Sequence, residues 1–308
     1  MSIAILGVFV ADTAYRGARM PRMGETVLGQ SFVLGPGGKG SNQAVAAARA
    51  ANGAFPVTMM TRLGDDDFAD LAEATWKEAG VTPAVTRDAS SYTGAAFIFI
   101  DDATGDNAII IAPGAAGDIA VADIEANRAT IADASVFMTQ LEQPIEAAQA
   151  ALAIAREAGT TTILNPAPAA ELSDDLLALC DHATPNETEA EALTGLSVGS
   201  EDEARTAADA LLSRGVGHAV ITLGERGALV HGPGVSQVVP AFDCGPVVET
   251  TGAGDAFNGG FAVALAEGRS VIEAARFGCA TASLSVTRPG TAPSMPTRAE
   301  IEAVLGTS

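Results

Sequence analysis

Residues 135–165 read SVFMTQLEQPIEAAQAALAIAREAGTTTILN, and this stretch decides the fold class. Two short apolar runs, Ser135–Thr139 and Thr161–Asn165, flank a segment with helical periodicity, Ile145–Ala158. Each run has the length of a buried strand, and turn residues bound it. Strands that alternate with helices in this way favour a parallel sheet covered by helices.

The same alternation continues toward both ends of the chain. Ser2–Val10 reads as a buried first strand, and further apolar runs lie at Val57–Thr61 and His218–Thr222. A second helical pattern covers Glu201–Arg214. The sequence therefore predicts an α/β fold with helices on both faces of a mainly parallel sheet. Because no linker or repeat interrupts this pattern, we expect a single domain over residues 1–308.

One region departs from the alternation. Two β-like segments, Tyr92–Ile100 and Asn107–Ala112, flank a turn rich in Asp and Gly, which predicts a β-hairpin. Another β-like run lies near Thr26–Leu34. Together, the segments at about 13–34 and 92–112 predict a small second sheet that projects from the main one. Such an appendage serves either as a lid over a ligand or as a dimer surface.

The chain is strongly acidic, with 17 Lys and Arg residues against 38 Asp and Glu and a net charge of −21. Such a surface repels nucleic acid and anionic lipid, so we expect neither nucleic acid nor a membrane as a partner. The three cysteines, Cys180, Cys244 and Cys279, are far apart, which predicts no disulfide framework and favours a reducing, cytoplasmic location. The apolar run at the start is too short to span a membrane.

A first glycine-rich loop, Gly35-Pro36-Gly37-Gly38-Lys39-Gly40, leads into an Ala-rich helix over Ser41–Asn52. The loop contains G-x-G-x-x-G, but it does not occupy the first strand–helix turn that a dinucleotide-binding fold requires. It is no P-loop either, because Lys39 is followed by Gly40 rather than Ser or Thr. By itself, the motif indicates no more than a strand-to-helix turn.

A second glycine loop, Thr250-Thr251-Gly252-Ala253-Gly254-Asp255-Ala256-Phe257, opens a helix that runs toward Ala266. Its glycines let successive backbone N–H groups point at one ligand, and the helix N-terminus adds partial positive charge. The loop therefore predicts an anion site. A carboxylate beside it suits a general base next to a transferring phosphoryl group. From spacing alone, Asp255 is either that base or an N-terminal helix cap.

Several motifs together identify a family. Gly37–Ala44 lies near the start and Thr250–Phe257 near the end. Between them lie Gln140-Leu141-Glu142, Asn165-Pro166-Ala167-Pro168, Thr184-Pro185-Asn186-Glu187-Thr188-Glu189 and Ile221-Thr222-Leu223-Gly224. In this order and spacing, the chain resembles the ribokinase-like (phosphofructokinase-B-type) carbohydrate kinases over almost its whole length. The set is far more specific than either glycine loop alone.

The resemblance implies a doubly wound α/β fold with a small β lid that clasps a second subunit, and hence a homodimer. It implies transfer of the γ-phosphoryl group of ATP, with Mg²⁺, to a primary hydroxyl of a sugar. The first expectation is the 5-hydroxyl of D-ribose, which gives ribose 5-phosphate. In this reading Asp255 takes the hydroxyl proton. The backbone N–H groups of Gly252, Ala253 and Gly254 hold the charge on the phosphoryl oxygens.

The resemblance also assigns residues to four sites. The sugar pocket comprises Val10, Asp12, Gly38, Lys39, Gly40, Asn42, Glu142 and Asp255. The ATP site comprises Asn186, Thr222, Gly224, Gly227, Gly254 and Cys279. Asn186 and Glu189 match an N-x-x-E motif that helps to organise Mg²⁺, often through water. An activating monovalent cation, K⁺, is expected near Glu249, Thr251, Ser285, Arg288, Gly290 and Ser294.

Two positions depart from the family pattern and leave alternatives open. Val10 stands where many relatives carry Asn, and an apolar residue there also occurs in relatives that phosphorylate 2-deoxyribose. Glu249 stands where Asp is usual, and its extra methylene is enough to shift or weaken a K⁺ site. The acceptor is therefore D-ribose, 2-deoxyribose, another sugar or a nucleoside. A non-catalytic sugar-binding protein is a further alternative, against which Asp255 and the intact glycine loop argue.

Overall fold

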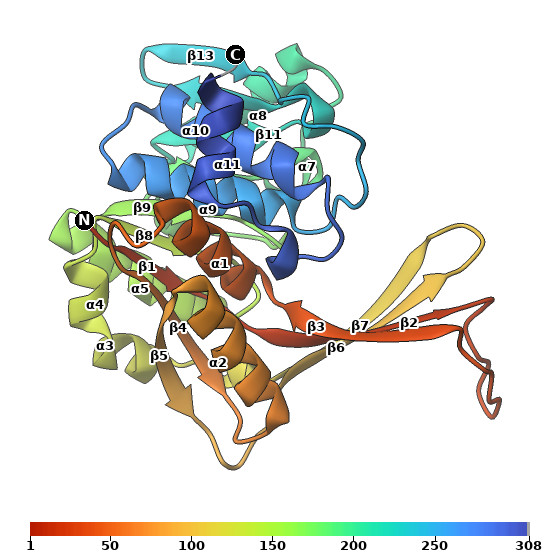
Figure 1. The fold of residues 1–308 in the computed structure, drawn as a ribbon. Helices are drawn as coiled ribbons and strands as arrows, with labels where there is room; N and C mark the ends of the chain where they lie inside the picture. Colours follow the sequence, from red (N-terminus) through yellow and green to blue (C-terminus); the bar gives the residue numbers. More distant parts are fainter. Residues whose placement is uncertain (307–308) are drawn as a thin grey trace.

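The computed structural model describes residues 1–306, which form a large and a small β-sheet (Figure 1). The large sheet has the strand order β13-β12-β11-β10-β9-β8-β1-β4-β5. Its strands are β1 (Ile3–Leu6), β4 (Val57–Leu63), β5 (Thr82–Arg87), β8 (Val136–Thr139), β9 (Thr161–Leu164), β10 (His182–Ala183), β11 (His218–Thr222), β12 (Ala228–Gly232) and β13 (Val235–Val239). Neighbours from β5 to β11 pair in parallel, and β12 and β13 add an antiparallel edge. The prediction of a mainly parallel sheet is confirmed.

Helices cover both faces of the large sheet because its central strands are apolar on both sides. In β1, Ile3 and Ile5 belong to one hydrophobic core, and Ala4 and Leu6 belong to the other. The first core is covered by α1 (Lys39–Ala51), α2 (Asp67–Ala79), α9 (Ala253–Ala266), α10 (Val271–Ser285) and α11 (Arg298–Gly306). The other side carries α3 (Val121–Ala126), α4 (Arg128–Ala132), α5 (Ile145–Ala158), α6 (Asp174–Leu177), α7 (Glu187–Thr194) and α8 (Glu201–Ser213).

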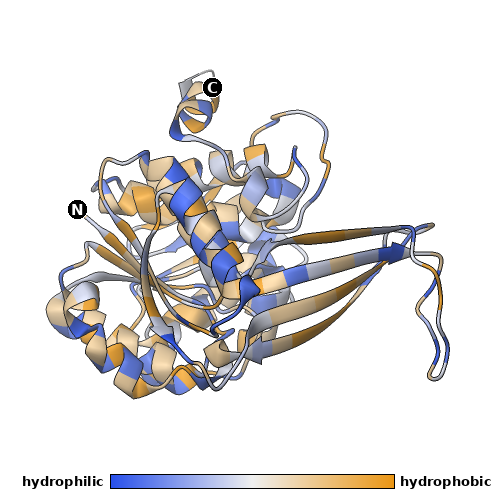
Figure 2. Ribbon diagram, turned by 60° about the horizontal axis from the view of Figure 1, so that its bottom comes forward, coloured by the Kyte–Doolittle hydropathy of each residue, from blue (hydrophilic) through white to orange (hydrophobic). Residues whose placement is uncertain are grey.

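The small sheet projects away from this body, with the strand order β3-β2-β6-β7 (Figure 1). Its strands are β2 (Val10–Gly17), β3 (Ser31–Gly37), β6 (Thr93–Asp101) and β7 (Asn107–Gly114). The predicted hairpin is present as β6 and β7, which pair antiparallel. Apolar residues run along these strands although much of the sheet is exposed (Figure 2). The separate small sheet expected from the sequence is therefore confirmed.

Three boundaries differ from the prediction. The β-like run near Thr26–Leu34 becomes a strand only from Ser31, where pairing with β2 begins. The apolar run Ser2–Val10 is not one strand, because β1 ends at Leu6 and Val10 begins β2 in the other sheet. The glycine loop is also shorter than expected, since β3 continues through Gly37 and α1 begins at Lys39. Pairing of β3 with β2, which sets Gly37 opposite Val10, holds the first glycines in extended conformation.

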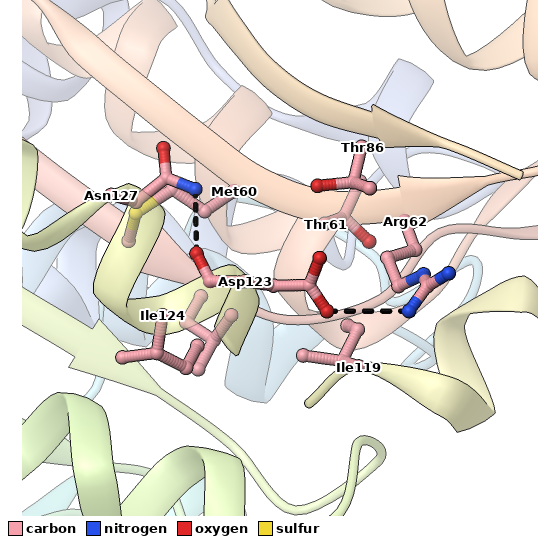
Figure 3. A pocket seen from close by; sticks show the side chains of 9 residues that line it. Met60, Thr61, Arg62, Thr86, Ile119, Asp123, Ile124 and Asn127 are labelled. Carbon is pink, nitrogen blue, oxygen red and sulfur yellow. Dashed lines mark hydrogen bonds and ion pairs between the residues drawn. The ribbon is translucent and has the colours of Figure 1, made fainter. Parts of the chain in front are cut away.

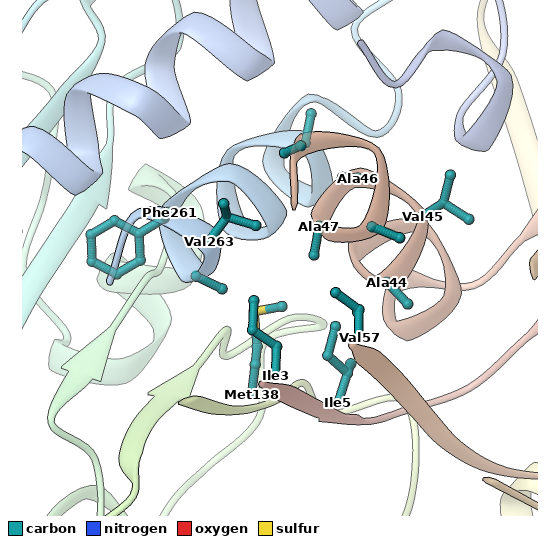
Figure 4. Packing of buried hydrophobic residues seen from close by; sticks show 14 of the residues in the cluster. Ile3, Ile5, Ala44, Val45, Ala46, Ala47, Val57, Met138, Phe261 and Val263 are labelled. Atoms are coloured by element: carbon teal, nitrogen blue, oxygen red, sulfur yellow. The ribbon is translucent and has the colours of Figure 1, made fainter. Parts of the chain in front are cut away.

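Small side chains bring α1 close to α9 above the sheet. Figure 4 shows Ile3, Ile5, Val57 and Met138 on the strands beneath these two helices. A Cβ atom on Gly259 of α9 would lie 2.5 Å from the Cβ atom of Ala46 and 2.9 Å from the carbonyl oxygen of Gln43. Only glycine permits this approach, which places the polar first turn of α1 against α9.

Two further sequence expectations bear on the surroundings of the protein. In the part of the chain from residue 1 to 306, no helix combines the length and the apolarity needed to cross a membrane. The cysteines Cys180, Cys244 and Cys279 are all free thiols.

Candidate active site

The candidate site lies where several parallel strands end. Gln140 directly follows β8, Asn165 follows β9 and Thr184 follows β10. Because β1 pairs with β4 on one side and with β8 on the other, the strand order reverses next to these ends. Open α/β sheets bind their ligands in the crevice at such a point. The first turns of α1 and α9 face each other here, as their side-chain bonds show.

Asp255 is buried in the first turn of α9 and is held by α1. Its Oδ2 accepts a hydrogen bond from Asn42 Nδ2 at 3.0 Å, and its Oδ1 accepts one from Gln43 Nε2 at 3.0 Å. The N-cap position of α9 belongs to Gly252, whose φ of 83° favours glycine. Asp255 is therefore not a helix cap. Its carboxylate faces the other helix instead.

The charge on Asp255 depends on opposing effects. Burial raises the pKa of Asp255 above its ordinary value. The positive charge of Lys39 and the amide groups of Asn42 and Gln43 act in the opposite direction, because each favours the carboxylate. A buried carboxylate with a nearby cation and two amide donors is an arrangement suited to accepting a proton.

Lys39 lies among the carboxylates of this site. Its backbone N–H donates to Glu142 Oε2 at 2.8 Å, which fixes Glu142 at the entrance to α1. Burial acts to lower the pKa of Lys39, but Asp255, Glu142 and Glu189 outweigh burial and raise it. Burial also raises the pKa of Glu142 to about 7, against the effect of Lys39. The structure thus brings together Lys39, Glu142 and Asp255, three of the residues that the resemblance assigned to the sugar pocket.

Asp12 lies on β2, at the base of the small sheet. A Cβ atom on Gly37 in the neighbouring strand would lie within 2.5 Å of both Asp12 carboxylate oxygens, so a larger residue there would displace the Asp12 carboxylate. Burial and, to a smaller extent, the nearby charge of Glu249 raise the pKa of Asp12 to about 6. Asp12 is therefore part of the same acidic site, and Glu249 approaches it from the loop before α9.

The remaining predicted sugar-pocket residues line the entrance to α1. Val10 is buried at the start of β2. Gly38 is the N-cap of α1 with φ 87°, and a Cβ atom there would lie 2.5 Å from the Val8 carbonyl oxygen. A Cβ atom on Gly40 would lie 2.7 Å from Gly7 Cα. Both glycines let α1 approach the segment between β1 and β2.

The glycine loop before α9 offers an incomplete set of free amides. The N–H group of Ala253 donates to the Thr250 carbonyl oxygen at 3.1 Å, so a turn within the loop already uses it. Beside Gly254, a Cβ atom would meet no described atom within 4 Å. This open space lies at the positive end of α9, where an anion is stabilised.

The predicted Mg²⁺ motif forms a helix cap. Asn186 is the N-cap of α7: its Oδ1 accepts from the Glu189 N–H at 2.8 Å, and Glu189 Oε2 accepts from the Asn186 N–H at 2.9 Å. Burial raises the pKa of Glu189. Within residues 1–306, no cluster of three or more His, Cys, Asp or Glu side chains is arranged to hold a metal ion. Only the side-chain atoms of Asn186 and Glu189 that these two hydrogen bonds do not use are available to bind Mg²⁺ or its water.

The predicted ATP residues lie in two places. Thr222 ends β11 and pairs with Asn186, so these two positions are adjacent. Gly224 opens the short 3₁₀ turn Gly224–Arg226, and Gly227 has φ 99°, which lets the chain pass close to the Val239 carbonyl oxygen. Cys279 is buried in α10, with its thiol directed at the same Val239 carbonyl oxygen.

The predicted monovalent-cation residues lie in the segment before α9, at the end of α10 and in the loop that follows it. Glu249 Oε2 accepts a hydrogen bond from the Gly290 N–H at 2.8 Å. The Glu249 N–H donates to the Val286 carbonyl oxygen at 3.2 Å, which ties the segment before Thr251 to the same loop. The hydroxyls of Ser285 and Ser294 donate to carbonyl oxygens of their own turns, and Arg288 forms an ion pair with Glu300.

A small cavity lies elsewhere, beside the end of β4 and α3 (Figure 3). It is lined by Leu6, Met60, Thr61, Arg62, Thr86, Ile119, Asp123, Ile124 and Asn127. Arg62 pairs there with Asp123 at 3.3 Å and with Asp88 at 2.9 Å. None of the predicted site residues lines this cavity, so we interpret these contacts as structural.

Sequence reasoning missed a group of buried amides around Asp255. Gln43 bonds Asp255 directly, and Asn165 and Gln140 bond Gln43. All three residues lie in motifs that carried the family resemblance, but none had been given a role. The available signal was their position, because Gln140 and Asn165 come directly after buried strands.

The chain is similar to known sugar kinases over its whole length. It matches the family described as pfkB family carbohydrate kinase over residues 2–298. The ribokinase of Haemophilus influenzae is 40% identical over 300 residues, 97% of this chain and 96% of that protein. The deoxyribokinase of Salmonella typhi is 37% identical over 298 residues, 96% of each. A solved structure of Arabidopsis thaliana ribokinase complexed with ribose and ATP matches with a TM-score of 0.92 and 30% identity, covering 99% of both chains.

These matches agree with the fold, in which a mainly parallel sheet with helices on both faces carries a small separate sheet. The chain belongs to the pfkB family of carbohydrate kinases and is an ATP-dependent sugar kinase.

Proposed function

We propose that this kinase transfers the γ-phosphoryl group of ATP to the 5-hydroxyl of D-ribose, with Asp255 as the general base. The observation that carries the proposal is the buried Asp255 carboxylate, which two amide groups hold at 3.0 Å at the N-terminus of α9. Similarity to ribokinases from bacteria and a plant supports D-ribose as the acceptor.

In the proposed reaction, Asp255 accepts the proton of the sugar hydroxyl as its oxygen attacks the γ-phosphorus atom. The new O–P bond forms while the bond between the γ-phosphorus and the β,γ-bridging oxygen breaks, and ADP leaves with that oxygen. The N–H groups of Gly252 and Gly254 and the ammonium group of Lys39 stabilise the charge on the phosphoryl oxygens. Burial of Asp255 raises its pKa and so strengthens it as a base.

The sugar pocket is proposed between α1 and the base of the small sheet. Asp12, Asn42 and Glu142 supply the oxygen acceptors that sugar hydroxyls need. Within residues 1–306, the buried Asn42 Oδ1 atom has no hydrogen-bond partner, although Asn42 Nδ2 is bonded to Asp255. A sugar hydroxyl that donated to Asn42 Oδ1 would remove this unfavourable state.

A second acceptor, 2-deoxy-D-ribose, has specific support. Val10 is buried at the start of β2 and offers no hydrogen bond to a sugar hydroxyl. A relative called deoxyribokinase is 37% identical over 96% of this chain. If Val10 faces the 2-position, ribose leaves a hydroxyl unpaired at a cost of about 1–3 kcal/mol, and 2-deoxyribose does not.

Each proposed metal site depends on the oxygen atoms that the hydrogen bonds of the protein leave available. Because the cap of α7 uses Asn186 Oδ1 and Glu189 Oε2, the atom left for Mg²⁺ or its water is Glu189 Oε1, which fits a water-mediated role. Bound Mg²⁺ neutralises phosphate charge. For K⁺, the Glu249 carboxylate and the carbonyl groups of the loop after α10 are suitable oxygen ligands. Equal rates in Na⁺ and K⁺ would contradict the K⁺ site.

The small sheet is proposed as a lid and as a homodimer surface. Phe32 and Val33 on β3 are 54% and 61% exposed, and Ile110 on β7 is 65% exposed. Phe32 and Val33 are neighbours in one strand and point to opposite faces, so both faces of the small sheet expose apolar side chains. Exposed apolar side chains of this kind support an interaction surface. Sedimentation that finds only monomer at micromolar concentration would contradict the dimer. The free thiols Cys180 and Cys279 support a reducing compartment such as the cytosol.

The first experiment compares ATP turnover with D-ribose and 2-deoxy-D-ribose, in Mg²⁺ and K⁺, for the wild-type chain and Asp255→Asn. The substitution should lower kcat by on the order of 10²–10⁴, with a smaller effect on acceptor binding, since it removes the base but little volume. A preference for 2-deoxyribose would change the proposed acceptor but leave the proposed mechanism as it is. Near-normal turnover by Asp255→Asn would refute the base.

A further inference from the structure

The amide of Gln43 is fixed at both ends. Gln43 Nε2 donates to Asp255 Oδ1 and to Asn165 Oδ1, each at 3.0 Å. Gln43 Oε1 accepts a hydrogen bond from Gln140 Nε2 at 2.5 Å. If the Gln43 amide rotated by half a turn, its oxygen would face the Asp255 carboxylate and its NH₂ group would face the NH₂ group of Gln140. The network therefore permits one orientation.

A backbone carbonyl sets the orientation of this network. Asn165 Nδ2 donates to the Thr184 carbonyl oxygen at 3.0 Å, so Asn165 Oδ1 must face Gln43. The Thr184 hydroxyl donates to Asn258 Oδ1 at 2.6 Å, and Asn258 Nδ2 donates to the Gly254 carbonyl oxygen at 2.9 Å. Thr184, at the end of β10, thus helps to orient both Asp255 and the glycine loop that carries the anion site.

The network is also buried. Gln43 and Gln140 are fully buried, Asn165 is 6% exposed and Thr184 is 1% exposed. Water competes poorly for hydrogen bonds at such positions, and a misplaced amide would leave a buried polar group unpaired. Gln140 Oε1, by contrast, has no partner in the part of the chain that the structure describes. Its NH₂ group is the part of Gln140 that the network uses.

We propose that Gln43 is a positioning residue for the phosphoryl transfer: oriented by Gln140, Asn165 and Thr184, it holds the Asp255 carboxylate in its ionised form and in line with the acceptor hydroxyl. The inference rests on the proposed role of Asp255 as the base. It gives a function to three motifs, Gln140–Glu142, Asn165–Pro168 and Thr184–Glu189. The amides of Gln140 and Asn165 bond Gln43, and the Thr184 carbonyl oxygen orients Asn165.

The charged groups that face Asp255 are Lys39 from α1, Glu142 after β8 and Glu189 from α7. Substitutions at Gln43 leave all of them in place. Removal of an N–H donor destabilises the carboxylate relative to the acid, so the pKa of Asp255 rises. The acid limb of the pH profile of kcat/KM must therefore move to higher pH.

The test uses Gln43→Met, which keeps the volume and removes the amide. We expect the acid limb to move to higher pH by about one unit, because the variant removes one of several groups that stabilise the Asp255 carboxylate. We also expect kcat to fall by about 10- to 100-fold, while KM for the acceptor changes much less. Gln43→Glu should shift the limb further upward, because it sets a second carboxylate beside Asp255.

A matched control is Gln143→Met. Gln143 is also buried, and its amide donates to the Thr139 hydroxyl at 2.8 Å and to the Gln140 carbonyl oxygen at 2.6 Å, away from Asp255. It should lower the melting temperature to a similar extent without moving the pH profile. If Gln43→Met does not fold, Gln140→Met replaces it and should give a smaller shift in the same direction.

A second measurement does not depend on turnover. In protein labelled with ¹³C at the aspartate carboxyl carbon, the Asp255 signal is the one that Asp255→Asn removes, and its titration reports the pKa directly. A higher pKa in Gln43→Met but not in Gln143→Met supports the inference. Titration curves of Gln43→Met and wild type that superimpose overturn it. Wild-type activity of Asp255→Asn instead refutes the base assignment, a separate outcome.

Discussion

Replacing Gly40 by Ala should impair catalysis far more than it impairs folding. A Cβ atom at this position would lie 2.7 Å from Gly7 Cα, 2.9 Å from the Val8 nitrogen and 3.0 Å from the Gly7 carbonyl carbon. All three are backbone atoms and cannot rotate away. Ordinary contact begins near 3.4 Å, so α1 must retreat by about 0.7 Å.

The two consequences differ in size. Overpacking costs typically about 1–3 kcal/mol, but Ala in place of Gly in a helix recovers about 1 kcal/mol, so the net loss of stability is about 0–2 kcal/mol. The same retreat displaces Lys39, Asn42 and Gln43, which share the first turn of α1 with Gly40. A misplacement of about 1 Å costs up to 10²-fold in rate, so kcat should fall by about 10- to 100-fold.

Steady-state turnover and thermal melting of Gly40→Ala provide the assay, with Gly35→Ala as the control. A Cβ atom on Gly35 in β3 meets no described atom within 4 Å, and its φ is not positive, so this variant should behave as wild type. If Gly40→Ala kept kcat within about twofold, or lost activity only in proportion to unfolded protein, the argument from close approach would be refuted.

Three further predictions follow from described contacts. Burial and the neighbouring His218 lower the pKa of His182 to about 4, whereas an unfolded His titrates near 6.5. The free energy of unfolding should therefore fall by about 3 kcal/mol between pH 6.5 and 4. In denaturant titrations, His182→Phe should show a flatter dependence of this free energy on pH over the same range. Arg62→Met should lower the unfolding free energy by about 1–3 kcal/mol, because Arg62 pairs with Asp88 and Asp123; a melting curve identical to wild type would contradict this. Val10→Asn should raise the ratio of kcat/KM for ribose over 2-deoxyribose by about five- to 150-fold, measured with both sugars side by side; an unchanged ratio would show that position 10 does not read the 2-hydroxyl.

The layered fold follows from local patterns. Short apolar runs such as Thr161–Asn165 alternate with amphipathic segments such as Ile145–Ala158, and these two segments form β9 and α5 within one residue of the expected bounds. Such patterns report burial on the scale of one strand or helix, which is what the layers of this fold require. They do not report which sheet a strand joins.

The break between β1 and β2 illustrates that limit. Val8 and Phe9 are 3% and 0% exposed, so the run Ser2–Val10 is apolar and buried throughout, as a strand would be. The chain nevertheless leaves the large sheet at Gly7, because Gly40 packs there and Val10 pairs with Gly37. Both contacts join segments far apart in the sequence, and no local signal predicts them.

Local patterns predicted Asp255 and the two glycine loops, because a carboxylate beside a glycine loop that opens a helix can be singled out in the sequence. The family resemblance then assigned Asp12, Asn42 and Glu142, but it gave no role to Gln43. Gln43 is one polar residue inside a helix, and nothing local separates it from a solvated side chain. Its role appears only when Gln140 and Asn165 reach it from two different strand ends.

The small sheet is connected to the proposed sugar pocket. β2 carries Asp12, and the Thr291 hydroxyl donates to the Pro36 carbonyl oxygen in β3 at 2.9 Å, joining the sheet to the loop after α10. A displacement of the sheet therefore moves Asp12 and that loop together. The position of the sheet and the binding of the acceptor are then thermodynamically linked. If holding the sheet in place raises acceptor affinity by a certain factor, a bound acceptor favours that position of the sheet by the same factor. A second subunit that held the sheet would act as an effector of acceptor affinity, and acceptor concentration would in turn govern how tightly two subunits associate.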